Sequence, residues 1–428
     1  MSILLRLGRL RGISWYIGLI GASLSLIFTF LVYPAIAGSH HALLDPDLHG
    51  PLGFGIWKYH TFSYYPKTEL SSSRGPLYPL FIAGLLALTN GSWPYSVQLA
   101  QCILFGLLCV LVFWTAKALW NRPLAVLAAG LCAVDPILIW YTSRILIETL
   151  MMFLFTVLIA GIVLVKHRPT AWTALLVGLI LGLSVMAKSI YVPFLVLVPV
   201  LLLVPFGTRV RPALAAVVFV SGILVAAPWT LRNGRVAGIF APEVGRNGFT
   251  LHQGNDFVED FARAPFSISA LHLLSITRMR AESESVTLPP DIEGLQRQNA
   301  MDAALRRNAI AKLEGSPAFF LKKIAYDSFL FWTLGETADK SLFIALLQLP
   351  VVALFCAFLI VRRRLVSQGA VGICAAVIVL FYLAHLPTIA LARYSVVLVP
   401  AMLIIAVGLF EPYSHRSQAL HSAVPASA

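Results

Sequence analysis

The chain has 428 residues, of which 59% are hydrophobic and 12% are charged, and its formal net charge is +13. Soluble domains contain about 45–50% apolar and about 25% charged residues, so this composition excludes an ordinary soluble enzyme. A disordered chain is excluded as well, because such chains are poor in large apolar residues. The composition predicts an integral membrane protein with several spans, in which excess positive charge first indicates loop asymmetry rather than a nucleic-acid partner.

Apolar runs of about 17–25 residues predict ten membrane-spanning helices. The first run is longer than the roughly 7–15 apolar residues of a signal peptide, so we expect an uncleaved anchor in spite of the Ala35-Ile36-Ala37 tripeptide. The run at 76–88 has only 13 residues, a length typical of a re-entrant or interfacial segment. The ten predicted spans are 13–37, 95–118, 124–140, 145–165, 171–187, 191–205, 212–228, 341–361, 369–385 and 395–410.

Lysine and arginine are enriched on the cytoplasmic side of membrane proteins. Three arginines precede the first predicted span, so its N-terminal side is expected in the cytoplasm. With ten spans every later basic cluster falls on the same side, whereas a span at 76–88 would move the Lys166 and Arg209 clusters across. This agreement favours the non-spanning interpretation and accounts for nearly all of the excess positive charge.

The spans divide the chain into three parts. An N-terminal transmembrane module covers 1–228 and includes the first outer loop at 38–94. An outer, periplasmic loop with amphipathic helices covers 229–340, and the last spans and a short cytoplasmic tail cover 341–428.

Two helices are expected near the end of the outer loop. The stretch 297–313 is charged and has apolar residues near helical spacing, which predicts an amphipathic helix lying on the membrane or on the spans. Ser316 followed by Pro317 predicts the N-cap and first position of the next helix.

Charged residues close to membrane depth are costly and mark functional sites. By the predicted topology, the charges that flank the spans converge on one wet cavity at the outer side. A carboxylate can act there as general base on an acceptor hydroxyl or amine, and cations can hold a phosphate as it leaves. This combination suits displacement at a phosphorylated carbon, and in a membrane the phosphate is expected to belong to a lipid. The charged residues are Asp45, Asp47, Arg74, Asp135, Arg144, Glu148, Lys188, Arg232 and Arg393.

Two of these positions carry local expectations. Arg144 and Glu148 are four residues apart and would share one face of a helix. Asp135 precedes Pro136 and is expected only to satisfy backbone groups in a broken helix.

Five short motifs appear in a fixed order along the chain. The first runs from Asp45-Pro46-Asp47 through Thr61-Phe62-Ser63-Tyr64 to Arg74-Gly75-Pro76-Leu77-Tyr78-Pro79. The others are Tyr141-Thr142-Ser143-Arg144 with Glu148, Gly182-Leu183 to Ala187-Lys188, Pro228-Trp229-Thr230-Leu231-Arg232-Asn233, and Ala392-Arg393-Tyr394. Together they resemble the GT-C superfamily of polyprenyl-phosphate-sugar-dependent glycosyltransferases. The nearest branch is the bacterial group of protein mannosyltransferases, lipid A aminoarabinose transferases and their uncharacterised relatives.

The resemblance implies a GT-C fold, an all-α polytopic bundle of about ten transmembrane helices. Juxtamembrane helices would occupy the first outer loop, next to a small outer helical segment. It also implies inverting transfer of a monosaccharide from a polyprenyl phosphate to a lipid, glycan or protein acceptor, outside the bacterial inner membrane.

The resemblance further assigns residues to roles. Asp45 matches the family's catalytic aspartate best, and Asp47 stays open as the alternative. Glu148 would be the second acidic residue, which orients the acceptor or binds a cation. The candidates for contact with the donor phosphate are Arg74, Arg144, Lys188, Arg232 and Arg393.

Departures from the family pattern leave alternatives open. His49 stands where relatives have tyrosine, and Ser73 stands where aminoarabinose transferases have glutamate. The missing glutamate weakens any metal site there and any claim of lipid A as acceptor, so no cofactor is assigned and a divalent cation stays open. Structural interpretations also exist, with Asp45 as a helix cap and Lys188 as an interfacial anchor.

The main alternative function is a transporter or flippase of an anionic lipid-linked substrate, and a non-catalytic scaffold is the third. Transporters often show two related halves with broken helices in matching positions. The sequence has no such symmetry, which favours the enzyme.

Overall fold

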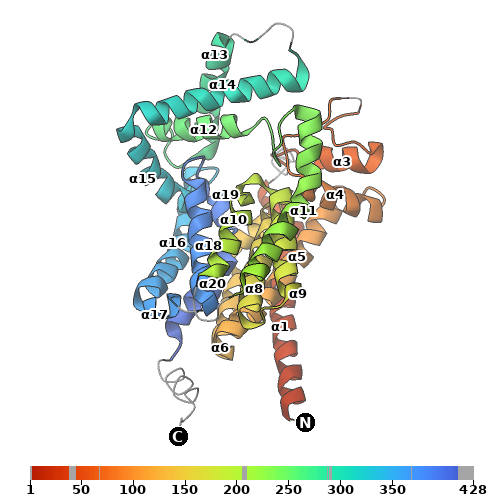
Figure 1. Cartoon of the computed structure of the whole chain (residues 1–428), viewed down its shortest axis with the longest axis vertical. Helices are drawn as coiled ribbons and strands as arrows, with labels where there is room; N and C mark the ends of the chain where they lie inside the picture. Colours follow the sequence, from red (N-terminus) through yellow and green to blue (C-terminus); the bar gives the residue numbers. More distant parts are fainter. Residues whose placement is uncertain are drawn as a thin grey trace.

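The computed structural model describes residues 2–37, 45–66, 68–204, 210–286, 288, 292–367 and 369–412. Within these ranges every regular element is a helix (Figure 1). The predicted all-α architecture is therefore confirmed for the described part of the chain.

Each of the ten predicted spans has a helical counterpart. Among the described residues, five helices are long and apolar enough to cross a membrane: Gly12–Ile36, α5 (Tyr95–Leu119), α8 (Glu148–His167), α11 (Pro212–Ala237) and α16 (Ala338–Val361). The first comprises most of α1 (Ser2–Ile27), a π-helical turn (Phe28–Val32) and α2 (Tyr33–Ala37). A bent pair of helices, α6 (Arg122–Val134) and α7 (Pro136–Thr142), meets the same length and composition when the two are taken together. The other counterparts are shorter: α9 (Ala171–Ala187), α10 (Phe194–Leu203) with the 3-10 turn before it, α18 (Gly369–His385) and α20 (Val399–Ala406).

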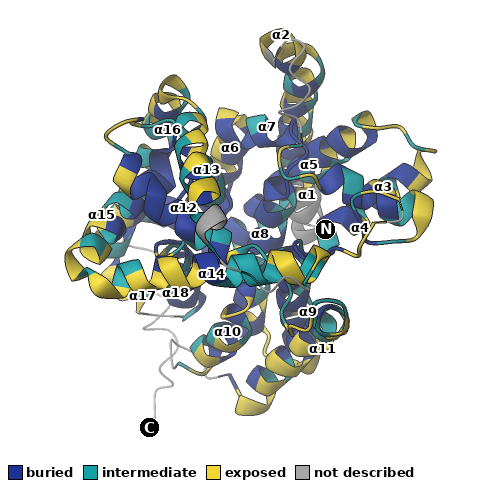
Figure 2. Cartoon of the chain, turned by 90° about the horizontal axis from the view of Figure 1, so that it is seen from above, coloured by how far each residue is buried: buried dark blue, intermediate teal, exposed yellow. Residues whose placement is uncertain are grey.

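The bundle is centred on α5, which packs against α1, α6 and α8. Its Phe105, Cys109 and Phe113 are fully buried. A second pair consists of α9 and α11, where Gly178 and Gly182 allow such close approach that a Cβ on either would clash with α11 carbonyl oxygens. In Figure 2 buried residues lie toward the middle of the bundle, for example on α5 and α8, and exposed residues lie on the outer faces of α14 (Gly294–Gly315) and α15 (Pro317–Thr333).

The two ends of the bundle differ as the charge pattern predicts. The start of α1 and the short basic helix α17 (Arg363–Val366) lie at one end (Figure 1). The polar helices α12 (Asn247–Asp260), α13 (Ile268–Ser285) and α14 lie at the opposite end. This arrangement agrees with basic segments on one side and the long polar loop on the other.

The third predicted span is broken, as expected from its sequence. Asp135 ends α6, and its Oδ1 accepts the backbone N–H groups of Ile137 (2.8 Å) and Leu138 (3.2 Å). Pro136 then begins α7, and the two helix axes differ by 53°. The carboxylate thus satisfies the first free N–H groups of the second helix.

The first outer loop contributes α3 (His49–Tyr59) and α4 (Leu77–Leu88), which pack on each other. At 12 residues, α4 is as short as the predicted non-spanning segment.

The outer segment contains α12 (Asn247–Asp260), α13 (Ile268–Ser285), α14 (Gly294–Gly315) and α15 (Pro317–Thr333). The predicted N-cap is confirmed, because Ser316 Oγ accepts the N–H of Phe319 at 3.3 Å. The main partner of α14 is α12 rather than the spans, and its expected position on the membrane stays a prediction. Gly248 lets α12 lie directly against the α14 backbone at Asp302, an approach that periodicity cannot reveal.

Candidate active site

Asp45 lies four residues before the start of α3 and accepts hydrogen bonds from that helix. Its carboxylate oxygens receive the backbone N–H groups of His49 at 2.9 Å and of Gly50 at 2.6 Å. The ring of Trp93 packs beside Gly50, where a Cβ would clash with it. Burial raises the pKa of Asp45 to about 6 in spite of the two hydrogen bonds. This carboxylate can therefore gain and lose a proton near neutral pH.

Asp47 is only two residues away but has the opposite environment. Arg74 Nη2 donates to the backbone carbonyl of Asp47 at 3.0 Å and to its Oδ1 at 3.1 Å. Arg393 Nη2 donates to Oδ2 at 2.7 Å. Burial opposes ionisation, but Arg393 and Arg74 together hold the pKa of Asp47 well below its usual range. Asp47 is therefore a permanent anion between two guanidinium groups.

Glu148, the first residue of α8, joins this cluster through Arg393. Its side chain is 0% exposed, and Oε1 lies 3.2 Å from Arg393 Nε. Within the described residues neither carboxylate oxygen has a hydrogen bond. Buried polar atoms without hydrogen bonds are uncommon in folded proteins, so Glu148 has unused acceptor capacity at the site.

His49 lies beside the same cluster. Its ring packs edge-on against Tyr78 with centroids 5.0 Å apart, and its Nδ1 is buried without a partner in the described part of the chain. Burial and the charge of Arg74 lower the pKa of His49 to about 3. The imidazole is therefore neutral at the site.

Arg144 does not pair with Glu148. No helix joins the two, because α7 ends at Thr142 and α8 begins at Glu148, so the predicted shared helical face was wrong. Arg144 forms an ion pair with Glu336 instead, and Lys340 Nζ donates to Glu336 at 2.5 Å. The turn between α7 and α8 is thereby tied to the start of α16.

Lys188 reaches the cluster from the end of α9. Its Nζ lies 3.8 Å from the centroid of the Tyr394 ring, and the guanidinium of neighbouring Arg393 lies 5.1 Å from the same ring. Lys188 also acts electrostatically on His49. The structure thus brings together Asp45, Asp47, Arg74, Glu148, Lys188 and Arg393.

Arg232 has a different set of partners. It donates to the backbone oxygen of Ser71 and to Asn233 Oδ1. Its guanidinium lies over the rings of Phe62 (5.4 Å) and Trp229 (4.6 Å). These contacts fasten the first outer loop to α11, so Arg232 is engaged in packing.

Sequence reasoning missed Arg246 and Glu336. Arg246 acts electrostatically on Asp47, Arg74 and Tyr394, which adds a cation to the cluster. Neither residue flanks a predicted span at a conspicuous spacing, and the outer loop is rich in charges. No pattern in the sequence separates these two from their neighbours.

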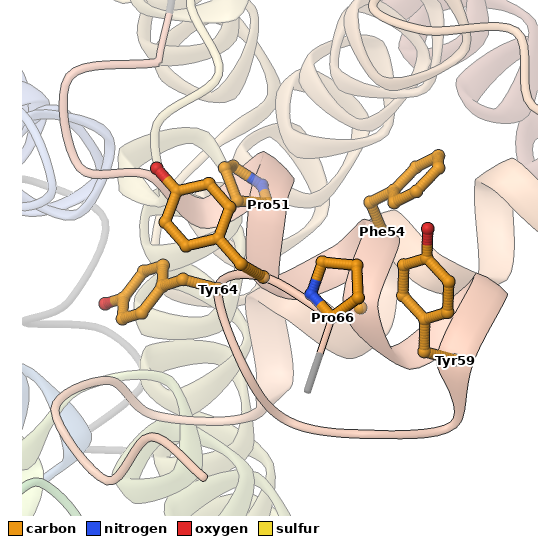
Figure 3. A pocket seen from close by; sticks show the side chains of 7 residues that line it. Pro51, Phe54, Tyr59, Tyr64 and Pro66 are labelled. Atoms are coloured by element: carbon orange, nitrogen blue, oxygen red, sulfur yellow. The ribbon is translucent and has the colours of Figure 1, made fainter. Parts of the chain in front are cut away.

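An aromatic cavity of about 240 Å³ lies on the first outer loop. Tyr64, on its wall, forms a hydrogen bond of 3.0 Å with Ser73, the residue before Arg74. Figure 3 shows the rings of Phe54, Tyr59 and Tyr64 grouped around the two prolines. The lining residues are Pro51, Phe54, Gly55, Tyr59, Tyr64, Tyr65 and Pro66. The lining includes none of the predicted catalytic or phosphate-binding residues, so the charged cluster is the better candidate for the chemistry.

A second charged network joins α12 and α13, away from the spans. Asp256 Oδ2 accepts from Ser275 at 2.7 Å, and its Oδ1 accepts from Arg278 at 3.0 Å. Arg278 also donates to Asp260 at 2.7 Å, and His252 bridges Asp256 and a glutamate of α13. Most of the hydrogen-bonding groups of this network are therefore paired with other members of the network.

A buried ion pair fastens the outer segment to the C-terminal helices. Lys323 of α15 is fully buried and donates to Asp327 at 2.6 Å and to the carbonyl of Thr388 at 2.8 Å. Gly254 of α12 lies so close to Thr388 that a Cβ would overlap its carbonyl oxygen. Three elements thus meet at the loop that precedes Arg393.

The arrangement of the acidic side chains bears on whether the site could hold a divalent metal ion. Among the described residues no group of three or more histidine, cysteine or acidic side chains is placed to hold one. Arg393 lies between Asp47 and Glu148, where its charge serves both carboxylates. The described residues therefore do not fit a site built on this pair of carboxylates.

Comparisons with known proteins give structural matches only. No family model matches the chain, and no curated protein matches it. The archaeal oligosaccharyltransferase AglB from Archaeoglobus fulgidus, in complex with an inhibitory peptide and a dolichol-phosphate, matches with TM-score 0.53 and 12% identity. The Archaeoglobus fulgidus oligosaccharyltransferase in the apo form matches with TM-score 0.56 and 15% identity. Both matches cover 97% of this chain and 52% of the other.

The chain has a GT-C-like fold. This confirms the fold that the five motifs implied, and with it a multi-pass helical membrane protein. The chain spans about half the length of the oligosaccharyltransferase structures that it matches.

Proposed function

We propose that this protein is a membrane glycosyltransferase that transfers a sugar from a polyprenyl phosphate to an acceptor, with inversion at the anomeric carbon. The observation that carries the proposal is the pair Asp45 and Asp47, which have opposite pKa shifts and lie beside a group of cations. The GT-C-like fold supports a lipid-linked donor, since the similar AglB structure contains a dolichol-phosphate.

Asp45 is proposed as the general base. Two carboxylates whose environments push their pKa values apart divide acid-base roles between them, and a base works best with a pKa near the operating pH. The acceptor oxygen or nitrogen bonds to the anomeric carbon as the bond from that carbon to the phosphate oxygen breaks. The acceptor's proton passes to Asp45, and the bonding electrons leave with the phosphate.

Asp47 is proposed as the anchor of the cations. Its charge fixes Arg74 and Arg393 in place before the donor arrives, and fixed charges stabilise a leaving group without reorganisation. Lys188 and Arg246 supply further positive charge that holds the donor phosphate in the ground state and in the transition state alike. Glu148 fixes Arg393 from its other side and offers free acceptor atoms to the acceptor substrate.

The remaining candidate cations have other partners. Arg144 and Arg232 are proposed to hold the site's loops, because their observed partners are Glu336 and the Ser71 carbonyl. The basic residues at the opposite end of the bundle support a site outside the bacterial inner membrane. The acceptor class stays a lipid, a glycan or a protein.

Reconstitution in lipid nanodiscs tests the proposal. Purified protein is supplied with a panel of labelled polyprenyl-phosphate monosaccharides and a membrane extract as acceptor. We expect release of polyprenyl phosphate and a labelled acceptor, both lost in Asp45→Asn and kept in Glu69→Ala, which removes another carboxylate of the same loop. Passage of label across sealed vesicles without a new glycosidic bond would instead identify a transporter.

A further inference from the structure

Glu243 lies in the link between α11 and α12 and accepts three hydrogen bonds. Its Oε1 receives the backbone N–H of Gly75 at 3.1 Å. Its Oε2 receives the backbone N–H of Ser189 at 3.0 Å and the Ser189 hydroxyl at 2.5 Å. One carboxylate therefore joins two turns that are 114 residues apart in sequence.

The two turns are those that carry phosphate-binding candidates. Gly75 directly follows Arg74, and Ser189 directly follows Lys188. The turns also touch, since a Cβ on Gly75 would lie 2.3 Å from the carbonyl oxygen of Met186. Glu243 thus lies where a small shift would change the distance between the two cations.

Residues on either side of Glu243 fasten the link. Pro242 accepts the indole N–H of Trp229 at 2.9 Å, and Val244 donates to the carbonyl of Ser72 at 2.8 Å. Arg246, three residues after Glu243, acts electrostatically on the Asp47 cluster. The link is held on both sides, so the Glu243 carboxylate has a fixed position from which to hold the two turns.

We propose that Glu243 is a positioning residue that sets the spacing of Arg74 and Lys188 for the donor phosphate. The inference rests on the proposed function, because it assumes that these two cations bind the donor. Hydrogen bonds to a carboxylate are about twice as strong as neutral ones, which suits a group that joins two turns. In this role Glu243 acts through the backbone groups of the two turns and does not contact the substrate itself.

The expected kinetic signature is a change in KM rather than in kcat. Contacts to the phosphate that exist in both the ground state and the transition state contribute uniform binding, and their loss raises KM with little change in kcat. For Glu243→Ala we expect the donor KM to rise about tenfold and kcat to stay within about twofold. Ser189→Ala removes only one of the three hydrogen bonds, so we expect about a threefold rise in KM.

Glu69→Ala is the matched control. Glu69 also joins two outer segments by accepting a backbone N–H, that of Leu295 at 2.6 Å, but it neighbours none of the candidate cations. Donor KM is measured for wild type and the three variants in nanodiscs. Binding of sugar-free polyprenyl phosphate is measured in parallel by native mass spectrometry.

The outcomes separate the two proposals. The positioning role is supported if Glu243→Ala weakens lipid binding and raises the donor KM. Ser189→Ala should show a smaller change in the same direction, and Glu69→Ala should show none. Equal KM values in the Glu243 and Glu69 variants, or a loss confined to kcat, would overturn it. If Glu243→Ala does not fold, Ser189→Ala decides alone by its KM. A wild-type protein that neither transfers sugar nor binds polyprenyl phosphate would overturn the proposed function, and this inference with it.

Discussion

The molecule contains two charged clusters that are built on different plans. In the outer network, Asp256 and its partners come from the consecutive helices α12 and α13, and both oxygens of Asp256 have donors. In the site cluster, Asp47, Arg74, Glu148 and Arg393 come from four separate parts of the chain.

The second difference concerns atoms that have no partner. The site cluster contains buried polar atoms without hydrogen bonds, on Glu148 and on His49. A cluster that satisfies its own members contributes to the stability of a domain, whereas one with unused hydrogen-bonding groups has capacity for a ligand. Charge density alone therefore does not identify a site, because among the described residues only one of the two clusters has such unused groups.

The largest effect is expected for Asp45→Asn. An amide keeps the shape but cannot take the acceptor's proton, so the transfer rate should fall by about 10²–10⁴-fold. Single-turnover assays with labelled donor measure it, with thermal unfolding as the check on folding. Full transfer by both Asp45→Asn and Asp47→Asn would remove the general base from the mechanism.

The next effect is expected for Arg393→Gln. It takes one cation from the phosphate and leaves the buried Glu148 without its ion-pair partner, so we expect a loss in kcat of about 10²-fold. Arg393→Lys keeps the charge but not the two-sided contact, and should recover part of the rate. Rates equal to wild type in both variants would show that the bridge has no catalytic role.

The dependence on pH should follow Asp45. Its pKa is raised to about 6 and the base must be ionised, so activity is highest above pH 7 and falls as the pH drops through 6. Below that value the rate should fall about tenfold per pH unit. Asp47, whose pKa lies well below its usual range, adds no step in this window. A profile that stays flat from pH 5 to 8 would contradict the assignment of Asp45.

In the outer network a substitution should affect stability instead. Asp256→Asn weakens contacts to Ser275, Arg278 and His252, and should lower the free energy of unfolding by about 1–3 kcal/mol. The donor KM of the folded fraction should be unchanged. Differential scanning fluorimetry measures the stability, and the nanodisc assay measures the donor KM. A raised donor KM with unaltered stability would show that the outer network also takes part in substrate binding.

The smallest effect is expected for Arg263→Ala. This side chain is 71% exposed and pairs with Asp260 at 3.0 Å. Exposed ion pairs contribute about 0–1 kcal/mol, so neither stability nor transfer should change measurably. A marked loss of transfer would extend the site beyond the cluster described.

Much of the fold was predictable because it depends on local signals. Apolar length indicated the spans, and Asp135-Pro136 indicated the break, since a carboxylate before proline caps a new helix. The position of α14 was not predictable, because its contact with α12 depends on close backbone approach at Gly248.

The site was predictable as a set of residues but not as a set of pairs. Position next to a span end indicated Asp47, Arg74 and Arg393. Their mutual contacts depend on how distant helices pack, and spacing wrongly suggested a shared helical face for Arg144 and Glu148. Glu243 gave no signal at all, because its role lies in accepting backbone N–H groups from two distant turns.

The buried Lys323 has a consequence for how this chain can be divided. Its ammonium reaches from α15 to the carbonyl of Thr388, in the loop that leads to Arg393. A graft of residues 229–340 onto another bundle would leave that ammonium with one partner fewer in an apolar setting, where an unmatched charge is costly. The part that can be transferred intact is therefore the outer segment together with the loop that contains Thr388. A domain boundary placed at the end of a span would separate the two.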